Sequence, residues 1–387
     1  MNVFFISLLC ISCFIWIILV FKKPRFYKYR EIFVPYNDQD DKISNKFPSI
    51  SVIIPARNEE DVLAKTLLSM VSQKYPNFEI ILVNDQSTDK TKKIAEDIKN
   101  NTKNNLLKII DTKKLPEGWV GKLWALQHGV EIALGDWILF TDADIEHPKF
   151  SLYSLISHAC EEKLDFFSLM AKLQAKSFWE KLLIPAFLYF FKLMYPFASV
   201  NMPDKKIAAA AGGCILFKKK ALEEIGGLNS IKDEVIDDIA FAKAIKGKGY
   251  KIKLMDGPDF ISKRSYNKLG QLWKMVTRTA FTELNYSYLK LLGCVLIMSI
   301  IFIAPLTGLL SPLYFNCTLF PLSIAILTMF LISFTYFETI IYFKISFIFL
   351  VSLPAAAILY ILMTIDSSIL YFFGIRSRWK NREYFYK

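Results

Sequence analysis

The sequence predicts an α/β protein with a mostly parallel sheet and with transmembrane helices at the N- and C-terminal ends of the chain. Two observations carry this prediction. Between residues 48 and 288, short apolar runs alternate with charge-rich stretches of helical periodicity, which is typical of a parallel α/β sheet. Long uncharged apolar runs lie before and after that region, and the first of them, residues 3–21, is long enough to cross a bilayer.

The composition indicates a membrane protein that also carries a polar domain. Apolar residues make up 53% of the 387-residue chain, yet 22% of the residues are charged. The formal net charge is +12, which we interpret as contact of Lys and Arg with the anionic headgroups of a bilayer. The sequence contains no zinc finger, RNA-binding aromatic signature or dense basic stripe, so nucleic acid is not expected as a partner. The six cysteines show no disulfide-framework spacing.

Residues 1–22 are expected to form an N-terminal membrane anchor. The segment lacks a basic start and a small-residue cleavage site, which argues against a signal peptide. Lys22, Lys23 and Arg25 follow at once, and by the positive-inside rule they hold the next segment in the cytoplasm. Residues 23–47 are interpreted as a basic and polar linker.

The C-terminal part is expected to form a membrane region, residues 289–375, followed by a basic tail, residues 376–387. Its apolar blocks are residues 291–313, 319–341 and 345–373. Three full crossings would place the basic tail outside, against the positive-inside rule, so one block is expected to be re-entrant or interfacial. The first block, with Pro305 and Pro312, is a candidate. The sequence thus predicts a multi-pass protein of the cell (inner) membrane, with residues 48–288 as a cytoplasmic catalytic domain.

Within the polar region, the expected strands are residues 49–54, 79–83, 106–110 and 137–141, and the expected helices are residues 59–73, 88–99 and 122–134. Residues 178–200 are apolar and aromatic, typical of an interfacial helix pair or of a buried core helix. A strand with a glycine kink is expected at 208–217 and a helix at 237–248. Because ligands bind at the carboxyl ends of strands in such sheets, the polar residues just beyond those ends are the candidate site.

The strongest local signal is Thr141-Asp142-Ala143-Asp144, at the end of an apolar strand. Side chains at alternate positions of a strand point to one side, so Asp142 and Asp144 can together hold a divalent cation that bridges a diphosphate. A hard cation with few protein carboxylates and with phosphate ligands fits Mg²⁺ or Mn²⁺. The alternative is a turn in which Asp144 caps the next element.

The first two strands also end in polar residues. Pro55, Arg57 and Glu59 follow the first strand and are expected to line a nucleotide pocket, although Glu59 at a helix start is also an ordinary partner of the helix dipole. Asp85 follows the second strand and could accept from a base N–H or a ribose hydroxyl. Residues 87–89, directly after it, are interpreted as helix caps.

Four further residues are candidates. Lys122 follows a glycine-bearing loop at a helix start, where backbone N–H groups and an ammonium could meet phosphate. Asp237 and Asp238 open a later helix, and one carboxylate there could act as a general base, unless both only favour the helix N-terminus. Arg278 could steady a diphosphate leaving group, or could contact lipid headgroups.

Taken together, these motifs resemble the family-2 inverting glycosyltransferases over most of residues 48–285. The segments SVIIPARNEE, VNDQSTDKT, TDAD and IDDIA occur in that family's order. Within the family, the chain looks most like the hopene-associated glycosyltransferases of bacteria. The stretches that carry this likeness are GWVGKLWAL, TDADIEHP, LLIPAFLYFFKLMYPFASVN, AAAAGGCILF and KMVTRTAFTEL.

The resemblance implies a nucleotide-sugar-binding domain of the GT-A type and the transfer of a sugar, with inversion, to a membrane lipid that could be a hopanoid. It implies donor contacts at Asp85, with Pro55, Arg57 and Glu59 nearby. It also implies a metal on Asp144, Asp142 on the donor ribose or the metal, and a catalytic base at Asp238.

Two departures from the family pattern matter. Asn84 stands where many relatives carry the first of two acids, so the donor contact is expected from Asp85 alone. The Gln-x-x-Arg-Trp signature of processive synthases is incomplete, since Met275 and Thr279 flank Arg278, which favours a single transfer. Two alternatives stay open: a transferase that forms polyprenyl-phosphate sugars or other glycolipids, and a non-catalytic membrane scaffold that binds nucleotide-sugar.

Overall fold

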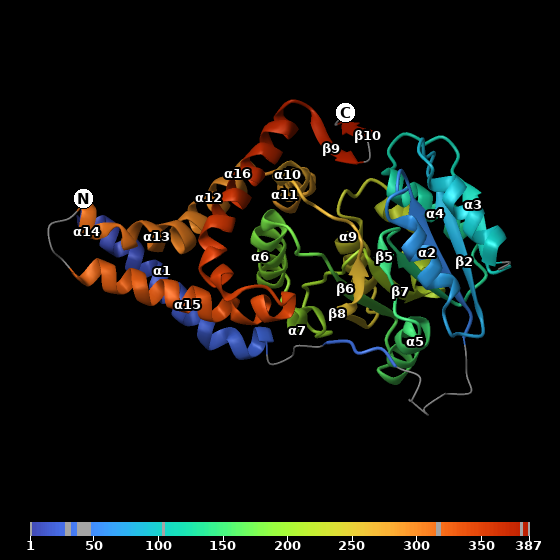
Figure 1. The fold of residues 1–387 in the computed structure, drawn as a ribbon, viewed down its shortest axis with the longest axis horizontal. Coiled ribbons are helices and arrows are strands. Elements are labelled where there is room, and N and C mark those ends of the chain that lie inside the picture. Colours follow the sequence, from blue (N-terminus) through green and yellow to red (C-terminus); the bar gives the residue numbers. More distant parts are fainter. Residues whose placement is uncertain are drawn as a thin grey trace. The chain divides into compact units, whose positions relative to one another are not determined.

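The protein forms two compact units in the computed structural model (Figure 1), and each is described by itself. The structure describes residues 2–27, 32–36, 48–102, 105–314, 319–379 and 382–385. The sheet unit comprises Arg30–Gln174 and Tyr195–Ser265. The helical unit comprises Met1–Tyr29, Ala175–Met194 and Tyr266–Lys387.

The sheet unit is built on an eight-stranded sheet in the order β3-β2-β1-β4-β7-β6-β8-β5. The strands are β1 (Ile50–Ala56), β2 (Phe78–Asn84), β3 (Leu107–Asp111), β4 (Trp137–Thr141), β5 (Ile145–Glu146), β6 (Phe166–Lys172), β7 (Cys214–Lys218) and β8 (Ile252–Ser262). Strands β1 to β4 are parallel to one another, and β8 is parallel to β6. Strand β7 is antiparallel to both of its neighbours, and β5 is antiparallel to β8. The prediction of a mostly parallel sheet is confirmed.

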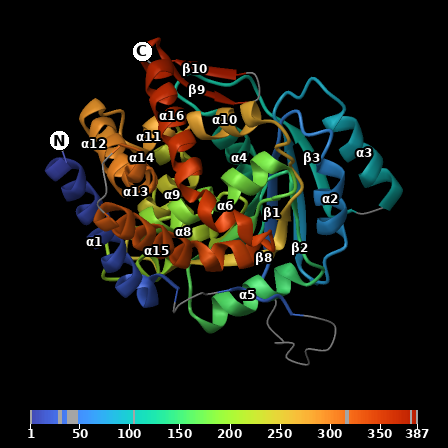
Figure 2. The same ribbon diagram turned by 60° about the vertical axis from the view of Figure 1, so that its left-hand side comes forward.

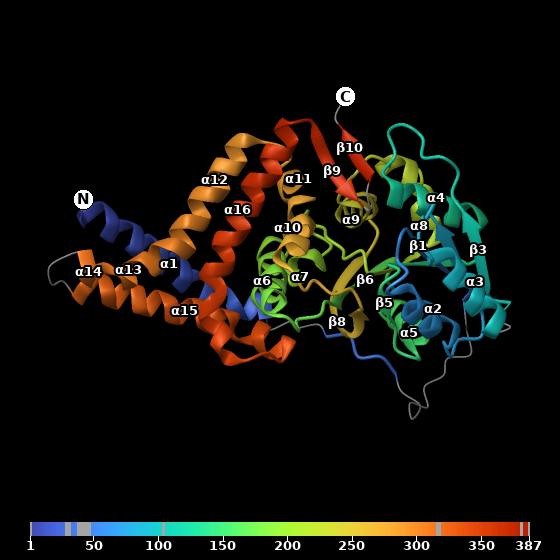
Figure 3. The ribbon, with the colours of Figure 1, turned by 45° about the horizontal axis from the view of Figure 1, so that its top comes forward.

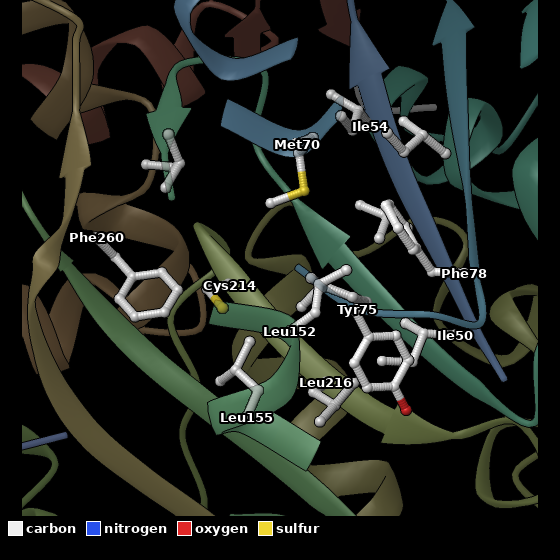
Figure 4. Packing of buried hydrophobic residues seen from close by; sticks show 14 of the residues in the cluster. Ile50, Ile54, Met70, Tyr75, Phe78, Leu152, Leu155, Cys214, Leu216 and Phe260 are labelled. Atoms are coloured by element: carbon white, nitrogen blue, oxygen red, sulfur yellow. The ribbon is translucent and has the colours of Figure 1, made fainter. Parts of the chain in front are cut away.

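Alternate side chains of the strands face two helical layers. On one face, residues such as Val52 and Ile54 join the main core with α2 (Leu63–Val71), α3 (Thr91–Thr102) and α5 (Ser151–Glu161). Figure 4 shows Leu152 and Leu155 of α5 in this core together with Leu216 of β7. Figure 2 shows α2 and α3 as neighbours at the β2–β3 end of the sheet.

The opposite face of the sheet is covered by α4 (Gly121–Ile132) and α9 (Asp237–Gly247). Gly129 lets α4 approach closely, because a Cβ atom added there would lie 2.4 Å from Ile53 Cγ2. Phe241 of α9 packs edge-on against Phe217 of β7, with ring centroids 4.8 Å apart. Both faces are therefore buried, which explains why the strands have continuous apolar runs instead of alternating ones.

Strands β1 and β4 separate before their carboxyl ends. The pairing of β1 with β2 continues to Ala56, whereas its pairing with β4 ends at Ile53. Pro55, which has no N–H, thus lies where no hydrogen bond to β4 is required. The strand order also reverses between β1 and β4, and this switch point is where open α/β sheets bind ligands.

The expected strands and helices before residue 141 are present, with shifted ends. Helix α2, for example, starts four residues later than expected, after a turn at residues 60–62. The strand expected at 208–217 begins only at Cys214, where pairing with Thr141 starts. The backbone of Ala211 bonds instead to the Ser168 hydroxyl, which accepts from its N–H at 2.9 Å and donates to its carbonyl at 3.2 Å. The Ser168 side chain thus takes the place of a neighbouring strand as the hydrogen-bond partner of Ala211.

The helical unit contains, among its described residues, four helices that are long and apolar enough to cross a membrane: Val3–Phe21, Tyr288–Leu309, Leu319–Phe343 and Phe347–Phe372. Helix α1 (Asn2–Tyr27) packs on α15 (Leu319–Phe343), and α12 (Tyr288–Met298) lies beside α16 (Leu353–Phe372), as Figure 3 shows. The expected apolar helices at both ends of the chain are confirmed. The number of full crossings stays a prediction.

The second of these helices contains a π-helical turn, Ser299–Ile303, between α12 and α13 (Ala304–Leu309). Such turns disturb the regular ladder of backbone hydrogen bonds. The carbonyl oxygen of Ile301 accepts from Trp16 Nε1–H at 2.8 Å and from Ser12 Oγ–H at 3.3 Å. Polar groups of α1 thereby bond to the backbone of the irregular turn.

The compact units divide the polypeptide differently from the expected continuous domain at 48–288. Helix α6 (Phe178–Met194) belongs to the helical unit, because its apolar face packs on α15 and α16. There the Tyr360 hydroxyl donates to the Leu183 carbonyl at 2.9 Å. The short α7 (Phe197–Val200), second member of the expected interfacial pair, belongs to the sheet unit.

The expected linker and tail are described only in part. Of residues 23–47, the structure describes 23–27, at the end of α1, and 32–36; the others lie outside the described residues. The expected basic tail contains an antiparallel pair, β9 (Ile375–Trp379) and β10 (Arg382–Phe385). Residues 380–381 and 386–387 lie outside the described part of the chain.

Candidate active site

A lysine and two aspartates from three separate elements meet in the sheet unit. Lys122, the second residue of α4, places its Nζ 3.0 Å from Asp142 Oδ1 and 3.1 Å from Asp237 Oδ2. Asp142 follows β4, and Asp237 is the first residue of α9. The fold therefore gathers three of the residues that the sequence predicted separately.

Asp238 lies beside this cluster and is oriented by backbone groups. The N–H of Gly212 donates to Asp238 Oδ2 at 2.8 Å, and the N–H of Ile239 donates to Oδ1 at 2.8 Å. A Cβ atom added to Gly212 would lie 2.9 Å from Lys122 Nζ, 3.5 Å from Asp238 Oδ2 and 3.9 Å from Asp142 Oδ2. These three polar side chains thus surround one glycine, and Gly212 leaves them the space they fill.

Burial and the neighbouring charges together set the protonation behaviour of this cluster. Burial, and then the neighbouring charge of Asp237, raise the pKa of Asp238 to about 7, against the opposing effect of Lys122. Burial alone would lower the pKa of Lys122, but Asp142, Asp237 and Asp238 raise it above its usual value, so the ammonium stays charged. Burial also raises the pKa of Asp142. A carboxylate with a pKa near neutrality suits general-base chemistry.

Asp144 forms a second polar cluster with the end of β8. Its Oδ2 accepts from Ser262 Oγ–H at 2.7 Å and lies 3.3 Å from Arg264 Nε. Arg264 Nη2 in turn lies 2.5 Å from Glu59 Oε2. The N–H of Lys263 donates to the Asp144 carbonyl at 2.7 Å, which ties the loop after β4 to the end of β8. Two predicted site residues, Glu59 and Asp144, therefore share one guanidinium.

Ser262 and Arg264 were missed in the sequence. The signal that could have revealed them is their place at the carboxyl end of β8, but that strand was itself not predicted. The strand itself contains Gly257 and Pro258, which normally indicate a turn. The structure accommodates them in an irregularity of the β6–β8 ladder, where the pairing moves from Gly257 to Ile261.

The residues present fit a hard divalent cation. Among the described residues, no group of three or more His, Cys, Asp or Glu side chains could hold a metal by itself. Asp142 and Asp144 nevertheless supply carboxylate oxygens from one short loop, and each of them already attracts a cationic group of the chain. Mg²⁺ and Mn²⁺ commonly take one or two carboxylates and complete their shell with phosphate and water.

The residues after β1 and β2 join two loops to each other. Asp85 is fully buried, and Thr112 Oγ1–H donates to its Oδ1 at 3.0 Å. Arg57 Nη1–H donates to the backbone carbonyls of Asp85 and Gln86, at 2.6 and 3.2 Å. Arg57 thus stabilises the loop that carries Asp85, and the donor contacts expected from Pro55, Arg57 and Asp85 stay predictions.

The expected caps of α3 are present in part. Asp89 Oδ1 accepts from the Thr91 N–H at 3.0 Å, as a cap does. Ser87 and Thr88 instead bond to Asn58: Ser87 Oγ accepts from the Asn58 N–H at 3.1 Å, and Asn58 Oδ1 accepts from the Thr88 N–H at 2.8 Å. They connect the two loops at the switch point.

Arg278 belongs to the helical unit, directly after α10 (Leu269–Thr277). Its Nε is buried and has no hydrogen-bond partner among the residues that the structure describes. Its expected contact with a leaving group stays a prediction.

Comparison with known families gives a match to part of the chain that contributes to these clusters. Residues 51–226 match the family model described as Glycosyl transferase family 2. That part of the chain is therefore similar to family-2 glycosyl transferases. The matched region includes Lys122, Asp142 and Asp144 and ends before Asp237 and Asp238.

Two curated relatives are similar to parts of this chain. The probable glycosyltransferase YdaM of Bacillus subtilis (strain 168) is 40% identical over 113 residues, which is 29% of this chain and 26% of the relative. The poly-beta-1,6-N-acetyl-D-glucosamine synthase of Staphylococcus aureus (strain MSSA476) is 26% identical over 284 residues, 71% of this chain and 62% of the relative. The chain therefore spans less than two thirds of the length of these relatives.

A solved structure shares the fold. The mannosyltransferase PcManGT from Pyrobaculum calidifontis, in complex with GDP-Man and Mn²⁺, matches with a TM-score of 0.60 and 17% identity, over 94% of this chain and 98% of that one. The expected GT-A-type α/β fold is therefore confirmed.

Proposed function

We propose that the protein is a membrane-bound glycosyltransferase that moves a single sugar, with inversion, from a nucleotide-sugar donor to a lipid acceptor. The observation that carries the proposal is the cluster of Lys122, Asp142, Asp237 and Asp238 in a chain that is similar in part to family-2 glycosyl transferases. One carboxylate of the cluster, that of Asp238, has a pKa near neutrality, and the adjacent ammonium is charged.

In the proposed reaction, Asp238 takes the proton of an acceptor hydroxyl while the hydroxyl oxygen attacks the anomeric carbon. The bond from that carbon to the diphosphate oxygen breaks, and the nucleoside diphosphate leaves with the electron pair. Attack from the side opposite the leaving group inverts the anomeric configuration. The N–H groups of Gly212 and Ile239 hold the carboxylate in one orientation throughout.

The leaving diphosphate carries negative charge that the site must offset. The ammonium group of Lys122 stays charged, and Asp237 helps to position this ammonium. Asp142 and Asp144 would hold a Mg²⁺ or Mn²⁺ ion, which when bound would add Lewis-acid stabilisation of the leaving group. The Mn²⁺ in the PcManGT complex supports this choice of metal. Pro55, Arg57, Glu59 and Asp85 are the proposed donor-side residues.

The apolar helices support a lipid acceptor. Four described helices are long and apolar enough to cross a membrane, and Lys22, Lys23 and Arg25 after the first of them favour a cytoplasmic sheet unit. A hopanoid acceptor rests on the sequence resemblance alone, and a polyprenyl phosphate or another glycolipid precursor would use the same site chemistry.

A second candidate function is the synthesis of a sugar polymer. It is favoured by the similarity to the poly-beta-1,6-N-acetyl-D-glucosamine synthase. Met275 and Thr279 beside Arg278 depart from the signature of processive synthases, so we favour a single transfer. The mass of the product separates the two, because one adds a single sugar and the other adds many.

The test is nucleotide release from UDP-, GDP- and TDP-sugars by the purified protein in lipid, with and without Mn²⁺. We expect one donor to give lipid-stimulated, Mn²⁺-dependent release, with loss of release in Asp144→Ala. Donor binding without turnover on any lipid extract would contradict the enzyme and favour a nucleotide-sugar-binding scaffold.

A further inference from the structure

Arg264 connects the ends of three strands in the sheet unit through one guanidinium. Its Nη2 lies 2.5 Å from Glu59 Oε2, beyond β1, and its Nε lies 3.3 Å from Asp144 Oδ2, beyond β4. The side chains are largely shielded from solvent, with exposed fractions of 28% for Arg264, 9% for Glu59 and 11% for Asp144. A guanidinium thus occupies one side of a carboxylate that is proposed to hold a metal ion.

The guanidinium and a divalent ion would compete for the same carboxylate group. Asp144 Oδ2 already accepts from Ser262 Oγ–H at 2.7 Å while it faces Arg264 Nε. Arginine does not lose its proton under ordinary conditions, so the conflict cannot be removed by neutralising Arg264. Two cations side by side in a partly buried site repel each other more strongly than they would in bulk water. A metal ion alone therefore binds against the charge of Arg264.

A nucleoside diphosphate removes this conflict, because its anionic oxygens can contact both cations. Phosphate oxygens coordinate Mg²⁺ or Mn²⁺, and a guanidinium can donate two parallel hydrogen bonds to a phosphate. Glu59 contacts Nη2 of the same guanidinium, whereas Asp144 faces Nε. The guanidinium can therefore release Asp144 and still be retained at the switch point.

We propose that Arg264 is a binding residue for the donor diphosphate and that it occupies Asp144 until the metal ion and the diphosphate arrive together. Arg264 then makes binding of the ion depend on binding of the nucleotide. This inference rests on the proposed nucleotide-sugar donor and divalent ion.

The neighbouring Lys263 provides a matched control. It carries the same charge, but its Nζ pairs with Glu146, not with the Asp144 carboxylate. Lys263→Gln therefore removes one positive charge from the same loop and leaves the Arg264–Asp144 contact in place.

The experiment measures Mn²⁺ binding to the full-length protein in detergent, from the paramagnetic resonance signal of the free ion, with and without UDP or GDP. Binding of UDP and GDP alone is measured in parallel. We expect Arg264→Gln to bind Mn²⁺ alone about tenfold more tightly, because Asp144 is released, and to bind the nucleotide about tenfold more weakly. Lys263→Gln should leave both affinities unchanged. Arg264→Lys keeps the charge but not the two parallel donors, so it should keep the Mn²⁺ affinity and weaken nucleotide binding.

Equal Mn²⁺ affinities in Arg264→Gln and Lys263→Gln would overturn the inference, and so would undiminished nucleotide binding in Arg264→Gln. If Arg264→Gln does not fold, as judged by its melting temperature, Arg264→Lys decides: unchanged nucleotide binding in that variant overturns the proposal. Absence of any binding of Mn²⁺, UDP and GDP to the unaltered protein is a distinct result, because it contradicts the proposed function itself.

Discussion

Asp238 is half protonated near neutral pH, because burial and the charge of Asp237 raise its pKa to about 7. Only the ionised carboxylate can take a proton from an acceptor. Activity should therefore fall as the pH drops through that pKa and rise above it. The proposed divalent ion, if bound by Asp142 and Asp144, would add positive charge nearby and move the midpoint below 7. A profile of kcat/KM between about pH 5 and 9 measures this fall in activity, the acid limb of the profile.

Asp237→Asn separates the two causes of the shift. Removal of the neighbouring negative charge lowers the pKa of Asp238, so the acid limb should move to lower pH, by up to about one unit. Glu234 is an exposed acid three residues before Asp237, and Glu234→Gln should leave the midpoint in place. A limb that stays fixed in Asp237→Asn, or moves to higher pH, contradicts the assignment of that limb to Asp238.

Gly212→Ala tests whether the space beside Lys122 matters for function. The added methyl group would lie 2.9 Å from Lys122 Nζ, the flexible end of a long side chain, so the fold should tolerate it while the ammonium is displaced. We expect activity to fall about ten- to a hundredfold with little change in melting temperature. Gly247→Ala, where an added Cβ meets nothing within 4 Å, is the control. A fully active Gly212→Ala enzyme would argue against a role for the position of Lys122.

At the scale of elements, the π-helical turn at Ser299–Ile303 depends on α1 for a hydrogen-bond donor. Trp16→Phe keeps an aromatic ring but removes the N–H that donates to the Ile301 carbonyl at 2.8 Å. We expect a loss of about 1 kcal/mol of stability, seen as a lower melting temperature in detergent. Phe14→Leu, at a side chain that is 63% exposed, should have a smaller effect. Equal melting temperatures for the two variants would show that the bond contributes little.

The elements that could be predicted from the sequence are those whose apolar runs lie between clear helical stretches. The strands β1 to β4 and the cluster of polar residues after them follow from this pattern, since parallel strands end at one edge of the sheet. Strand β8 could not be recognised, because Gly257 and Pro258 interrupt it. Arg264 was missed for the same reason. Its pairing with Glu59 joins residues that are 205 positions apart, which no local pattern indicates.

The boundaries of the units depend on contacts that are distant in sequence. Helix α6 is apolar and aromatic, which suits either a core or an interface, and only its packing on α15 and α16 assigns it to the helical unit. The expected division at residues 48–288 lacked that information.

At the scale of the whole molecule, the orientation in the membrane is open to direct measurement. The sheet unit is expected in the cytoplasm, and Cys160 is exposed on it. In a variant that retains only this cysteine, a membrane-impermeant maleimide should label Cys160 in permeabilised cells and not in intact cells. A variant that also lacks Cys160 gives the background. Labelling in intact cells would place the unit outside.

The central claim is that Asp238 is the base of a glycosyl transfer. The most direct test compares Asp238→Asn with Asp233→Asn, an exposed acid five residues earlier, for lipid-dependent release of nucleotide and for nucleotide binding. We predict that Asp238→Asn loses about a thousandfold in rate while it binds nucleotide as well as the unaltered protein does, and that Asp233→Asn keeps both. An Asp238→Asn protein that turns over at a rate close to that of Asp233→Asn would contradict the account.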